Sequence, residues 1–193
     1  MVFNKEKRIA FVFPPKTGSI STGSFLKSIG WKSLSYKHLE TKIYLDELPN
    51  LNNYTIYGFL RNPLARFESA ILHLKRDSEI DDFVHIIESN GKHVETVSYD
   101  EIVDLFPAII QKLPIFLGLQ SKWLSHPKVT VLDFDNLESE LRRITGDTTT
   151  PMPTYNVSDG FGKSVITDKV RAFVREYYAA DYALAKDRLG KEY

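Results

Sequence analysis

Hydrophobic residues gather in three short runs along the chain. Apolar residues fill Ile9–Phe13, between charged residues on one side and two prolines on the other. A continuous run of this length is typical of a strand that is buried on both faces, as in parallel sheets. Aromatic and β-branched residues predict a second strand at Tyr54–Leu60. A third strand is expected at Val129–Phe134, before an acidic turn.

Helical patterns follow the first two of these runs. The segment Ile20–Ser28 predicts a helix that ends at Gly30. Asn62 and Pro63 are residue types preferred at the N-cap and at the first position of a helix. The pattern behind them predicts a helix that runs to about Arg76.

The last clear element is a helix predicted from Asp168 to about Leu189, with Thr167 as its N-cap. Hydrophobic residues recur along it at helical spacing, which indicates a face that packs against the core: Val170, Phe173, Val174, Tyr177, Tyr178 and Tyr182. The middle of the chain, from Ser78 to Leu124, has a mixed helical pattern without clear boundaries.

Strands that alternate with helices predict the fold class. We expect one α/β domain over residues 1–193, with a mostly parallel sheet and helices on both of its faces. A chain of 193 residues suits a single hydrophobic core. In such sheets ligands bind beyond the carboxyl ends of the strands, so the loops after the predicted strands are the first places to search for a site.

Charge and composition narrow the function. The chain has 25 basic and 25 acidic residues, so no overall charge favours nucleic acid or a membrane surface as a partner, and any anion site must be built locally. It has no cysteine, which excludes disulfides and thiolate chemistry. The sequence contains neither a signal-peptide pattern nor a long apolar segment, and we therefore expect a soluble cytoplasmic protein.

A candidate phosphate-binding loop follows the first predicted strand. Residues 14–21 read Pro-Pro-Lys-Thr-Gly-Ser-Ile-Ser and lead into the first predicted helix. The N–H groups at a helix start lack internal partners and carry the positive end of the helix dipole, so they favour an anion. Gly18 permits close approach of the backbone, and Lys16 adds a mobile positive charge. The order differs from a Walker A loop, in which the lysine follows the second glycine.

A second candidate motif lies where the second predicted strand meets its helix. Arg61 ends the strand, and Ser69 follows eight residues later, about two turns into the helix. The planar guanidinium of Arg61 suits a phosphate monoester. Arg66, between them, either binds the ligand or points outward or into a salt bridge. The alternatives for Arg61 and Ser69 are an ion pair and a hydroxyl bonded back to a helix carbonyl.

These two motifs resemble those of sulfotransferases that use 3′-phosphoadenosine 5′-phosphosulfate (PAPS) as sulfuryl donor. Pro-Lys-Thr-Gly-Ser after an apolar strand is similar to the family's 5′-phosphosulfate loop. Arg-Asn-Pro-x-x-Arg-x-x-Ser is similar to its 3′-phosphate motif. The resemblance runs in order from about Ile9 to Tyr182. It implies a P-loop-like sulfotransferase fold and the transfer of a sulfuryl group from PAPS to a hydroxyl, with PAP as the product and without a metal.

The resemblance also implies which residues bind the donor. They are Pro15, Lys16, Thr17, Gly18, Ser19, Ile20, Ser21, Arg61, Ser69, Ser158 and Lys163. Ser158 belongs to a stretch similar to the family's Asn-x-Ser element, and Gln120 with Ser121 resembles the Gln-Ser segment of carbohydrate sulfotransferases. Ile20 departs from the pattern, because relatives usually have threonine there, and one hydroxyl donor is therefore lost.

Sulfuryl transfer needs a base for the acceptor proton and positive charge at the leaving phosphate. Lys16 fits the second role. For the base we choose His38, because a neutral imidazole is a natural base near pH 7 and relatives of the heparan sulfate 2-O-sulfotransferase type carry a catalytic histidine in a similar stretch. His73, on the same helix as Ser69, and Glu40 are the alternatives.

Two other functions stay open at this point. A nucleotide or small-molecule kinase would share the strand–loop–lysine–helix arrangement, and it would need Asp133 or Asp135 to hold Mg²⁺. A non-catalytic module would bind PAP without transferring anything. The resemblance favours a glycan or a small molecule with a sugar hydroxyl as the acceptor, whereas the sequence identifies neither the acceptor itself nor the oligomeric state.

Overall fold

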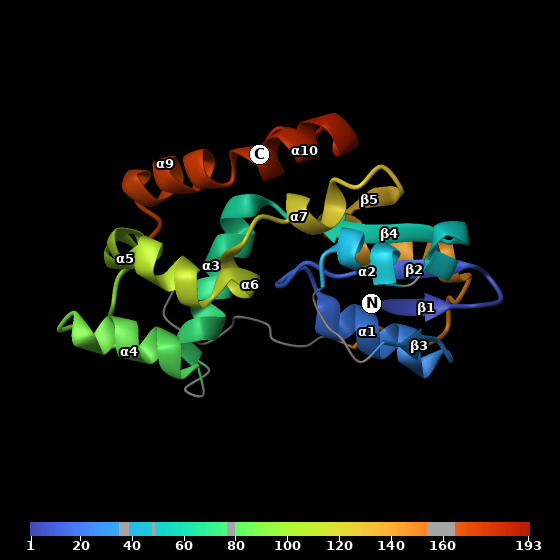
Figure 1. Cartoon of the computed structure of the whole chain (residues 1–193), viewed down its shortest axis with the longest axis horizontal. Helices are drawn as coiled ribbons and strands as arrows, with labels where there is room; N and C mark the ends of the chain where they lie inside the picture. The colour runs from blue at the N-terminus through green and yellow to red at the C-terminus, as the bar shows by residue number, and fades with distance from the viewer. Residues whose placement is uncertain (35–38, 48, 77–79, 154–164) are drawn as a thin grey trace.

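A five-stranded mixed sheet forms one part of the protein, and a layer of helices lies beside it. The computed structural model describes residues 1–34, 39–47, 49–76, 80–153 and 165–193. The strands are β1 (Val2–Asn4), β2 (Ile9–Val12), β3 (Lys32–Ser33), β4 (Thr55–Leu60) and β5 (Val129–Asp133), in the order β3-β1-β2-β4-β5 (Figure 1). The three strands expected from the sequence, which are β2, β4 and β5, are confirmed with small differences at their ends.

The expectation of a mostly parallel sheet is wrong. Strands β2, β4 and β5 are parallel, but β1 runs antiparallel to both β2 and β3. The cause is the connection from β1 to β2 over residues 5–8. It is long enough to join antiparallel neighbours but too short for the crossover that parallel neighbours need. Arg8 completes this turn with a positive φ of 51°.

The helices surround the sheet or form a separate layer beside it. Their bounds are α1 (Ser19–Ser28), α2 (Thr41–Glu47), α3 (Pro63–Arg76), α4 (Asp81–Ser89), α5 (Tyr99–Lys112), α6 (Pro114–Leu117), α7 (Ser121–Leu124), α8 (Leu137–Thr145), α9 (Asp168–Tyr177) and α10 (Ala179–Leu189). Short 3₁₀ turns are η1 (Pro49–Asn53) and η2 (Phe134–Asn136). None of the helices in the described ranges has both the length and the hydrophobicity that a membrane crossing needs.

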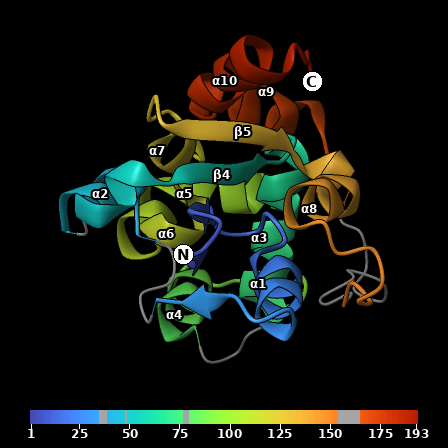
Figure 2. The same ribbon diagram turned by 90° about the vertical axis from the view of Figure 1, so that its right-hand side faces the viewer.

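Helices cover both faces of the sheet, as the sequence predicts. On one face, α2, α7 and α10 pack against the strands through Tyr44, Trp123 and Leu184. On the other face, α1 and α8 pack through Phe25 and Leu141. Figure 2 shows α2 and α8 on opposite sides of the strands. Most residues of β2, β4 and β5 are buried between these layers, which explains the continuous apolar runs.

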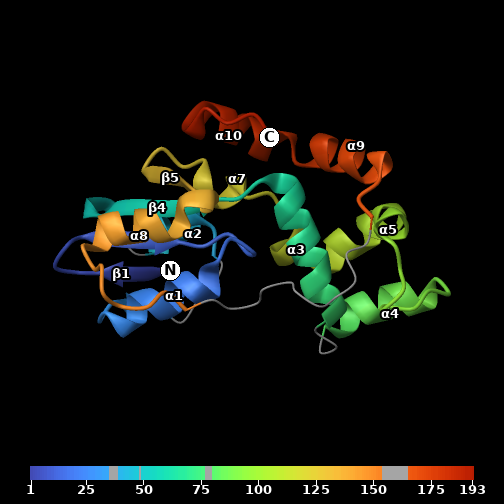
Figure 3. The same ribbon diagram turned by 180° about the vertical axis from the view of Figure 1, so that it is seen from behind.

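A helical layer extends from the sheet beyond the carboxyl ends of β2 and β4 (Figures 1 and 3). It consists of α3, α4, α5 and α9, which share one hydrophobic cluster. Phe67 of α3 lies in this cluster and contacts the rings of Tyr99, Phe106, Phe173 and Tyr178. Helix α3 begins directly after β4, so it connects the sheet to this layer.

The C-terminal segment forms two helices instead of the single helix expected. Tyr178, with φ −96° and ψ 22°, separates α9 from α10. Its ring is buried, and its hydroxyl donates a hydrogen bond to the carbonyl of Leu117 (2.7 Å). The break allows α9 to pack on the helical layer while α10 packs on the sheet (Figure 1). Periodicity predicts the apolar stripe but not this tertiary contact.

Two predicted helix starts are confirmed. The side-chain oxygen of Asn62 accepts hydrogen bonds from the N–H groups of Leu64 (2.9 Å) and Ala65 (3.2 Å). The hydroxyl of Thr167 accepts one from the N–H of Val170 (3.3 Å). The cap at Asn62 fixes the start of α3 immediately after β4, and so determines where the side chains of α3 lie relative to the end of that strand.

Candidate functional site

A cleft of about 680 Å³ lies beyond the carboxyl ends of β2 and β4. Residues of both predicted motifs line it: Pro15, Lys16, Gly18, Ser19, Ile20, Ser21, Arg61 and Ser69. The helical layer and the adjoining α6 contribute His73 and Phe116, and the corner between β5 and α8 contributes Phe134 and Leu137. The structure therefore brings two motifs that are far apart in the sequence to one space.

The loop between β2 and α1 has an unusual backbone. Lys16 and Gly18 have positive φ values of 67° and 72°. A Cβ atom at position 18 would meet Leu137 at 2.8 Å and Phe134 at 3.0 Å, so both conformation and space require glycine there. The left-handed conformation of Lys16 costs on the order of 1 kcal/mol and persists only where surrounding contacts hold it.

Hydrogen bonds within the loop and from the second motif hold this conformation. Thr17 is fully buried, and its hydroxyl donates to the carbonyl of Pro14 (2.7 Å). Its side chain therefore supports the loop and, unlike its predicted neighbours, does not line the cleft. The guanidinium of Arg61 donates from Nη1 to the carbonyl of Lys16 (3.1 Å). The second motif thus helps to shape the first.

Arg66 also holds the loop, and the expectations for its side chain are wrong. It is fully buried and is not among the residues that line the cleft. Its guanidinium donates to the carbonyls of Pro15 and Phe116 (both 3.1 Å) and lies 5.7 Å from the ring centre of Tyr178. These carbonyl oxygens accept from Nε and Nη2, whereas Nη1 is buried without a hydrogen-bond partner among the described residues, and no sequence pattern reveals such acceptors. Arg66 therefore holds the loop in position from its buried side.

The N-terminus of α1 opens onto the cleft. Gly18 is its N-cap and has no side chain to cap it, and the carbonyl of Gly18 accepts the first helical hydrogen bond from Thr22 (2.9 Å). The N–H groups of Ser19 and Ile20 consequently have no acceptor within the helix. The first turn contains no acidic residue. An anion in the cleft would meet these N–H groups and the positive end of the helix dipole.

A buried network fixes the backbone of Arg61. The side-chain amide of Gln120 accepts from the N–H of Arg61 (3.0 Å) and donates to its carbonyl (2.9 Å). The carboxylate of Asp181, on α10, accepts from the backbone N–H groups of Gln120 and Ser121 (both 2.8 Å). Gln120 and Asp181 are fully buried. The Gln-Ser segment noted in the sequence therefore positions Arg61 and does not line the cleft.

The side chain of Arg61 lies at the wall of the cleft. Its guanidinium lies 4.9 Å from the ring centre of Phe134. Burial lowers the pKa of Arg61, and the nearby carboxylates of Glu68 and Asp135 oppose this shift. A guanidinium has five N–H donors, and the bond to the loop uses one of them. The others suit the oxygens of a phosphate monoester.

Among the described residues, two carboxylates line the cleft, and each is paired with a cation that does not line it. Asp135 lies 2.9 Å from the ammonium of Lys191, and Glu138 lies 2.7 Å from the guanidinium of Arg142. Among the ion pairs of the described residues, none involves the cations of the two motifs. The cleft consequently offers positive charge to a ligand although the whole chain is neutral.

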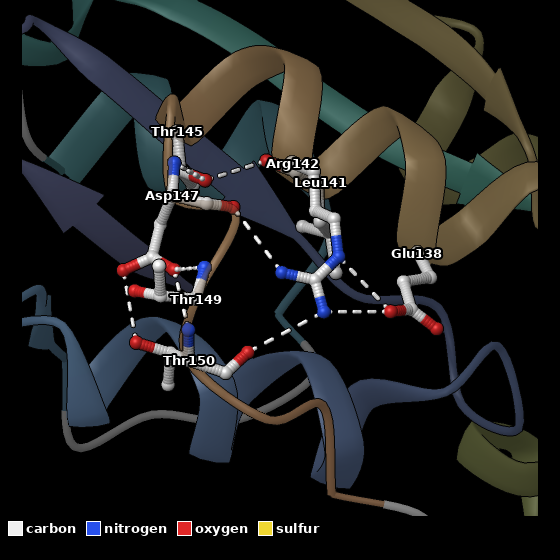
Figure 4. A network of polar contacts seen from close by, with 7 residues as sticks. All are labelled: Glu138, Leu141, Arg142, Thr145, Asp147, Thr149 and Thr150. Atoms are coloured by element: carbon white, nitrogen blue, oxygen red, sulfur yellow. Dashed lines mark hydrogen bonds and ion pairs between the residues drawn. The ribbon is translucent and has the colours of Figure 1, made fainter.

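Arg142 also holds the segment that follows α8 (Figure 4). Its guanidinium donates to the carbonyls of Asp147 (3.3 Å) and Thr150 (3.4 Å). The carboxylate of Asp147 in turn accepts from the N–H (2.8 Å) and the hydroxyl (2.9 Å) of Thr150. This network directs the chain toward Met152 and Pro153, which line the cleft.

Lys16 has a low pKa for a lysine. Burial, followed by the positive charges of Arg61 and Arg76, lowers the pKa of Lys16 to about 8. The ammonium is therefore charged at neutral pH, and it has an unfavourable environment that a bound anion would improve. A phosphate near Lys16 would raise its pKa again, because the phosphate stabilises the charged form.

The predicted base and two predicted donor ligands lie outside the described residues: His38, Ser158 and Lys163. Of the alternative bases, His73 lines the cleft, and its ring centre lies 5.4 Å from that of Phe116. Glu40 does not line the cleft, and its carboxylate lies 4.0 Å from the ammonium of Lys122. Of these two alternatives, His73 is the one that shares the space of the two motifs.

The acidic residues that a kinase would need have other partners. Asp133 and Asp135 both pair with the ammonium of Lys191. A magnesium ion at this strand end would have to compete with that ammonium. Among the residues that the structure describes, no group of three or more histidine, aspartate or glutamate side chains is arranged to hold a metal ion.

Sequence reasoning missed the apolar walls of the cleft. Phe134 follows β5, whose carboxyl end lies at the same edge of the sheet as those of β2 and β4, and this position could have identified it. Phe116 and Met152 come from α6 and from the segment after α8. Neither belongs to a local motif, because tertiary packing alone brings them to the site.

Comparisons with protein-family models, with curated proteins and with solved structures found no match for this chain. The case for a function consequently rests on the geometry and charge of the cleft and on the resemblance of the two motifs.

Proposed function

We propose that the protein is a sulfotransferase that transfers the sulfuryl group of PAPS to a hydroxyl of an acceptor, with the motif resemblance favouring a sugar hydroxyl. One observation carries the proposal: a single cleft unites the loop around Lys16 with Arg61 and Ser69. PAPS carries anionic groups on both its 5′ and its 3′ sides. Two anion-binding groups in one cleft meet that requirement.

The residues of the cleft fit such a nucleotide. The loop offers the ammonium of Lys16, the open N-terminus of α1 and the hydroxyls of Ser19 and Ser21 to the 5′ group. Arg61 and Ser69 offer a guanidinium and a hydroxyl to the 3′-phosphate. The wall with Phe134, Phe116 and Met152 suits an apolar ring system such as a purine.

In the proposed reaction the acceptor oxygen forms a bond to sulfur while the bond from sulfur to the bridging oxygen of the 5′-phosphate breaks. The products are the sulfated acceptor and PAP. The ammonium of Lys16 stabilises the charge that develops on the leaving phosphate. The hydroxyl proton passes to a base, for which His38 is the first candidate and His73 the second.

Calorimetry separates this function from the kinase alternative. We expect the protein to bind PAP in the presence of EDTA and to bind ATP with Mg²⁺ much more weakly. Transfer of label from ³⁵S-PAPS to a panel of sugars, lipids and phenols then separates an enzyme from a PAP-binding module. ATP binding that requires Mg²⁺, together with no affinity for PAP, would reverse the assignment.

Replacing Arg61 with alanine should weaken PAP binding by about 1.5–3 kcal/mol, the range for a charge-assisted hydrogen bond. The affinity for adenosine 5′-phosphate, which lacks the 3′-phosphate, should fall less, because only the bond from Arg61 to the loop is then lost. Isothermal titration calorimetry measures both affinities. Arg143→Ala is the matched control, because that arginine pairs with Glu140 and does not line the cleft. Equal losses for the two nucleotides would show that Arg61 does not bind the 3′-phosphate.

The affinity for PAP should decrease as the pH rises above about 8, where free Lys16 loses its proton. Below this pKa the ammonium is already formed. Above it, binding must take up a proton, which reduces the affinity by up to about tenfold for each pH unit. Titrations at several pH values, in buffers of different ionisation enthalpy, measure both the affinity and the proton uptake. Lys16→Arg should remove this dependence, and a pH-independent wild type would contradict the role of Lys16.

His38→Ala should lower kcat by about 10²–10⁴-fold, the contribution of a general base, and leave the affinity for PAP nearly unchanged. His73→Ala and Glu40→Ala test the alternatives with the same two measurements. The base is the residue whose loss reduces turnover without affecting PAP binding. Full turnover in His38→Ala would exclude His38 from this role.

A further inference from the structure

The cleft continues from the anion-binding loop along one side of α1. Ile20, Gly23, Ser24 and Lys27 line it, and their spacing places them on one face of the helix. Strand β3, which is adjacent to α1, contributes Ser33, and the chain just after it contributes Leu34. We call this part of the cleft the α1 groove; it is defined by these six residues.

The α1 groove has an apolar floor with unfilled space. The side chain of Ile20 is 54% exposed although it is a large hydrophobic residue in the first turn of α1. Gly23 is itself buried, but a Cβ atom built there would meet no atom of another described segment within 4 Å, so space is left beside Ile20. Leu34 also lines this region. An apolar group of a ligand can therefore cover the exposed side chain of Ile20 and fill the space beside Gly23.

The far end of the α1 groove carries positive charge. Lys27 lies in the last turn of α1, and no ion pair of the described residues involves it. The groove itself contains no acidic residue, because Asp135 and Glu138 belong to the corner between β5 and α8. The charge of Lys27 acts inside the cleft: together with burial, the larger cause, it lowers the pKa of the Met1 amino group to about 6.

The spacing along α1 gives the groove a length. Lys27 lies seven positions after Ile20, and at 1.5 Å per residue this is about 10 Å along the helix axis. Ile20 adjoins the loop at which the sulfuryl group would be held, whereas Lys27 lies at the opposite end. A molecule that fills the groove would therefore present one end to the loop and the other end to an ammonium.

We infer that the acceptor is an amphiphilic hydroxy acid: its hydroxyl lies at the loop, an apolar segment of about 10 Å covers Ile20 and Gly23, and an anionic group pairs with Lys27. This inference rests on the proposed sulfotransfer. The reaction is the same: the hydroxyl oxygen attacks sulfur, PAP leaves, and the hydroxyl proton passes to the base. Under this inference the acceptor is not a neutral sugar but a molecule with an apolar middle and a charged end.

A matched pair of probes tests the charge. We expect ω-hydroxyoctanoate to bind the protein–PAP complex at least tenfold more tightly than the corresponding neutral diol, and to accept label from ³⁵S-PAPS more efficiently. Lys27→Glu should abolish this preference while the affinity for PAP stays within twofold. Lys32→Glu is the control, because Lys32 is exposed on β3 and does not line the cleft.

A second pair of variants tests the hollow. Gly23→Leu should fill it and reduce the affinity for ω-hydroxyoctanoate by more than tenfold, whereas Gly23→Ala, whose methyl group meets nothing within 4 Å, should change it less than twofold. Both substitutions favour the helix, since glycine is the weaker helix former, so both proteins should fold. The affinity for PAP measures whether the nucleotide site is intact in each variant.

The outcomes separate the two proposals. Equal binding of the acid and the diol, no effect of Lys27→Glu, tighter binding of a neutral sugar than of either probe, or no binding of either probe would overturn the hydroxy-acid inference. Normal PAP affinity in those experiments would leave the proposed sulfotransfer standing. If the wild-type protein does not bind PAP, the proposed function fails, and the inference about the acceptor fails with it.

Discussion

A Lys16→Met variant should transfer the sulfuryl group about 10²–10³-fold more slowly than the wild type, the cost of removing one preorganised donor from a developing negative charge. Methionine keeps most of the aliphatic stem but removes the ammonium. The hydrogen bond from Arg61 to the backbone of residue 16 should persist, because it uses the carbonyl. The rate of a single turnover with ³⁵S-PAPS is the appropriate measurement, since it isolates the chemical step.

The loss should be specific to the charge at position 16. Lys16→Arg should recover part of the rate, because a guanidinium keeps the charge but has a different shape. Lys32→Met, on the exposed strand β3, should transfer at the wild-type rate. A Lys16→Met protein that retains full activity would show that Lys16 does not stabilise the leaving phosphate.

Replacing Asp181 with alanine should lower the free energy of unfolding by about 2–4 kcal/mol. The carboxylate accepts hydrogen bonds from the backbone N–H groups of Gln120 and Ser121, and from the side-chain amide of Gln120 at 3.4 Å. In the variant these donors would be left unpaired in the interior, which costs about 1–3 kcal/mol for each buried group. Urea unfolding measures the change.

Two comparisons make this result specific. Asp187→Ala, on the same helix, should leave the midpoint of urea unfolding almost unchanged. Asp187 is exposed, and among the described ion pairs it contacts only its neighbour Arg188. Folded Asp181→Ala protein should also bind PAP more weakly, since Gln120 then loses the contact that orients it toward Arg61. Wild-type stability in Asp181→Ala would refute the proposed network.

The elements with local signals could be predicted from the sequence. The apolar run Ile9–Phe13 and the two later runs identify the parallel strands, because a strand buried on both faces has no polar alternation. Asn62 and Thr167 identify helix starts because capping depends on a few adjacent residues. The same locality explains why the loop and the end of β4, which line one cleft, could be proposed from the sequence as candidate site elements.

The elements that depend on tertiary contacts could not be predicted. Strands β1 and β3 have three and two residues, too few for a reliable pattern, so the antiparallel half of the sheet was missed. The break at Tyr178 depends on a hydrogen bond to Leu117, 61 residues away. The burial of Arg66 could not be predicted either. Its hydrogen-bond acceptors are backbone carbonyls, which leave no signal in the sequence, so the side chain was expected at the surface or at the ligand.

The charge of the cleft also combines a part that the sequence predicts with a part that depends on tertiary contacts. The neutral composition predicts that any anion site is local, but it does not reveal which charges a cleft brings together. The carboxylates of Asp135 and Glu138 come to the cleft together with their partners Lys191 and Arg142. Because these pairs neutralise one wall, we expect Lys16 and the start of α1 to make the cleft favour an anion.

A crystal structure of the protein with PAP tests the central claim most directly. The account predicts one PAP molecule in the cleft, with its 5′-phosphate at the N–H groups of Ser19 and Ile20 and the ammonium of Lys16. It predicts that the 3′-phosphate contacts the guanidinium of Arg61 and the hydroxyl of Ser69. A nucleotide bound outside the cleft, or one whose two phosphates contact only one of the two motifs, would contradict it.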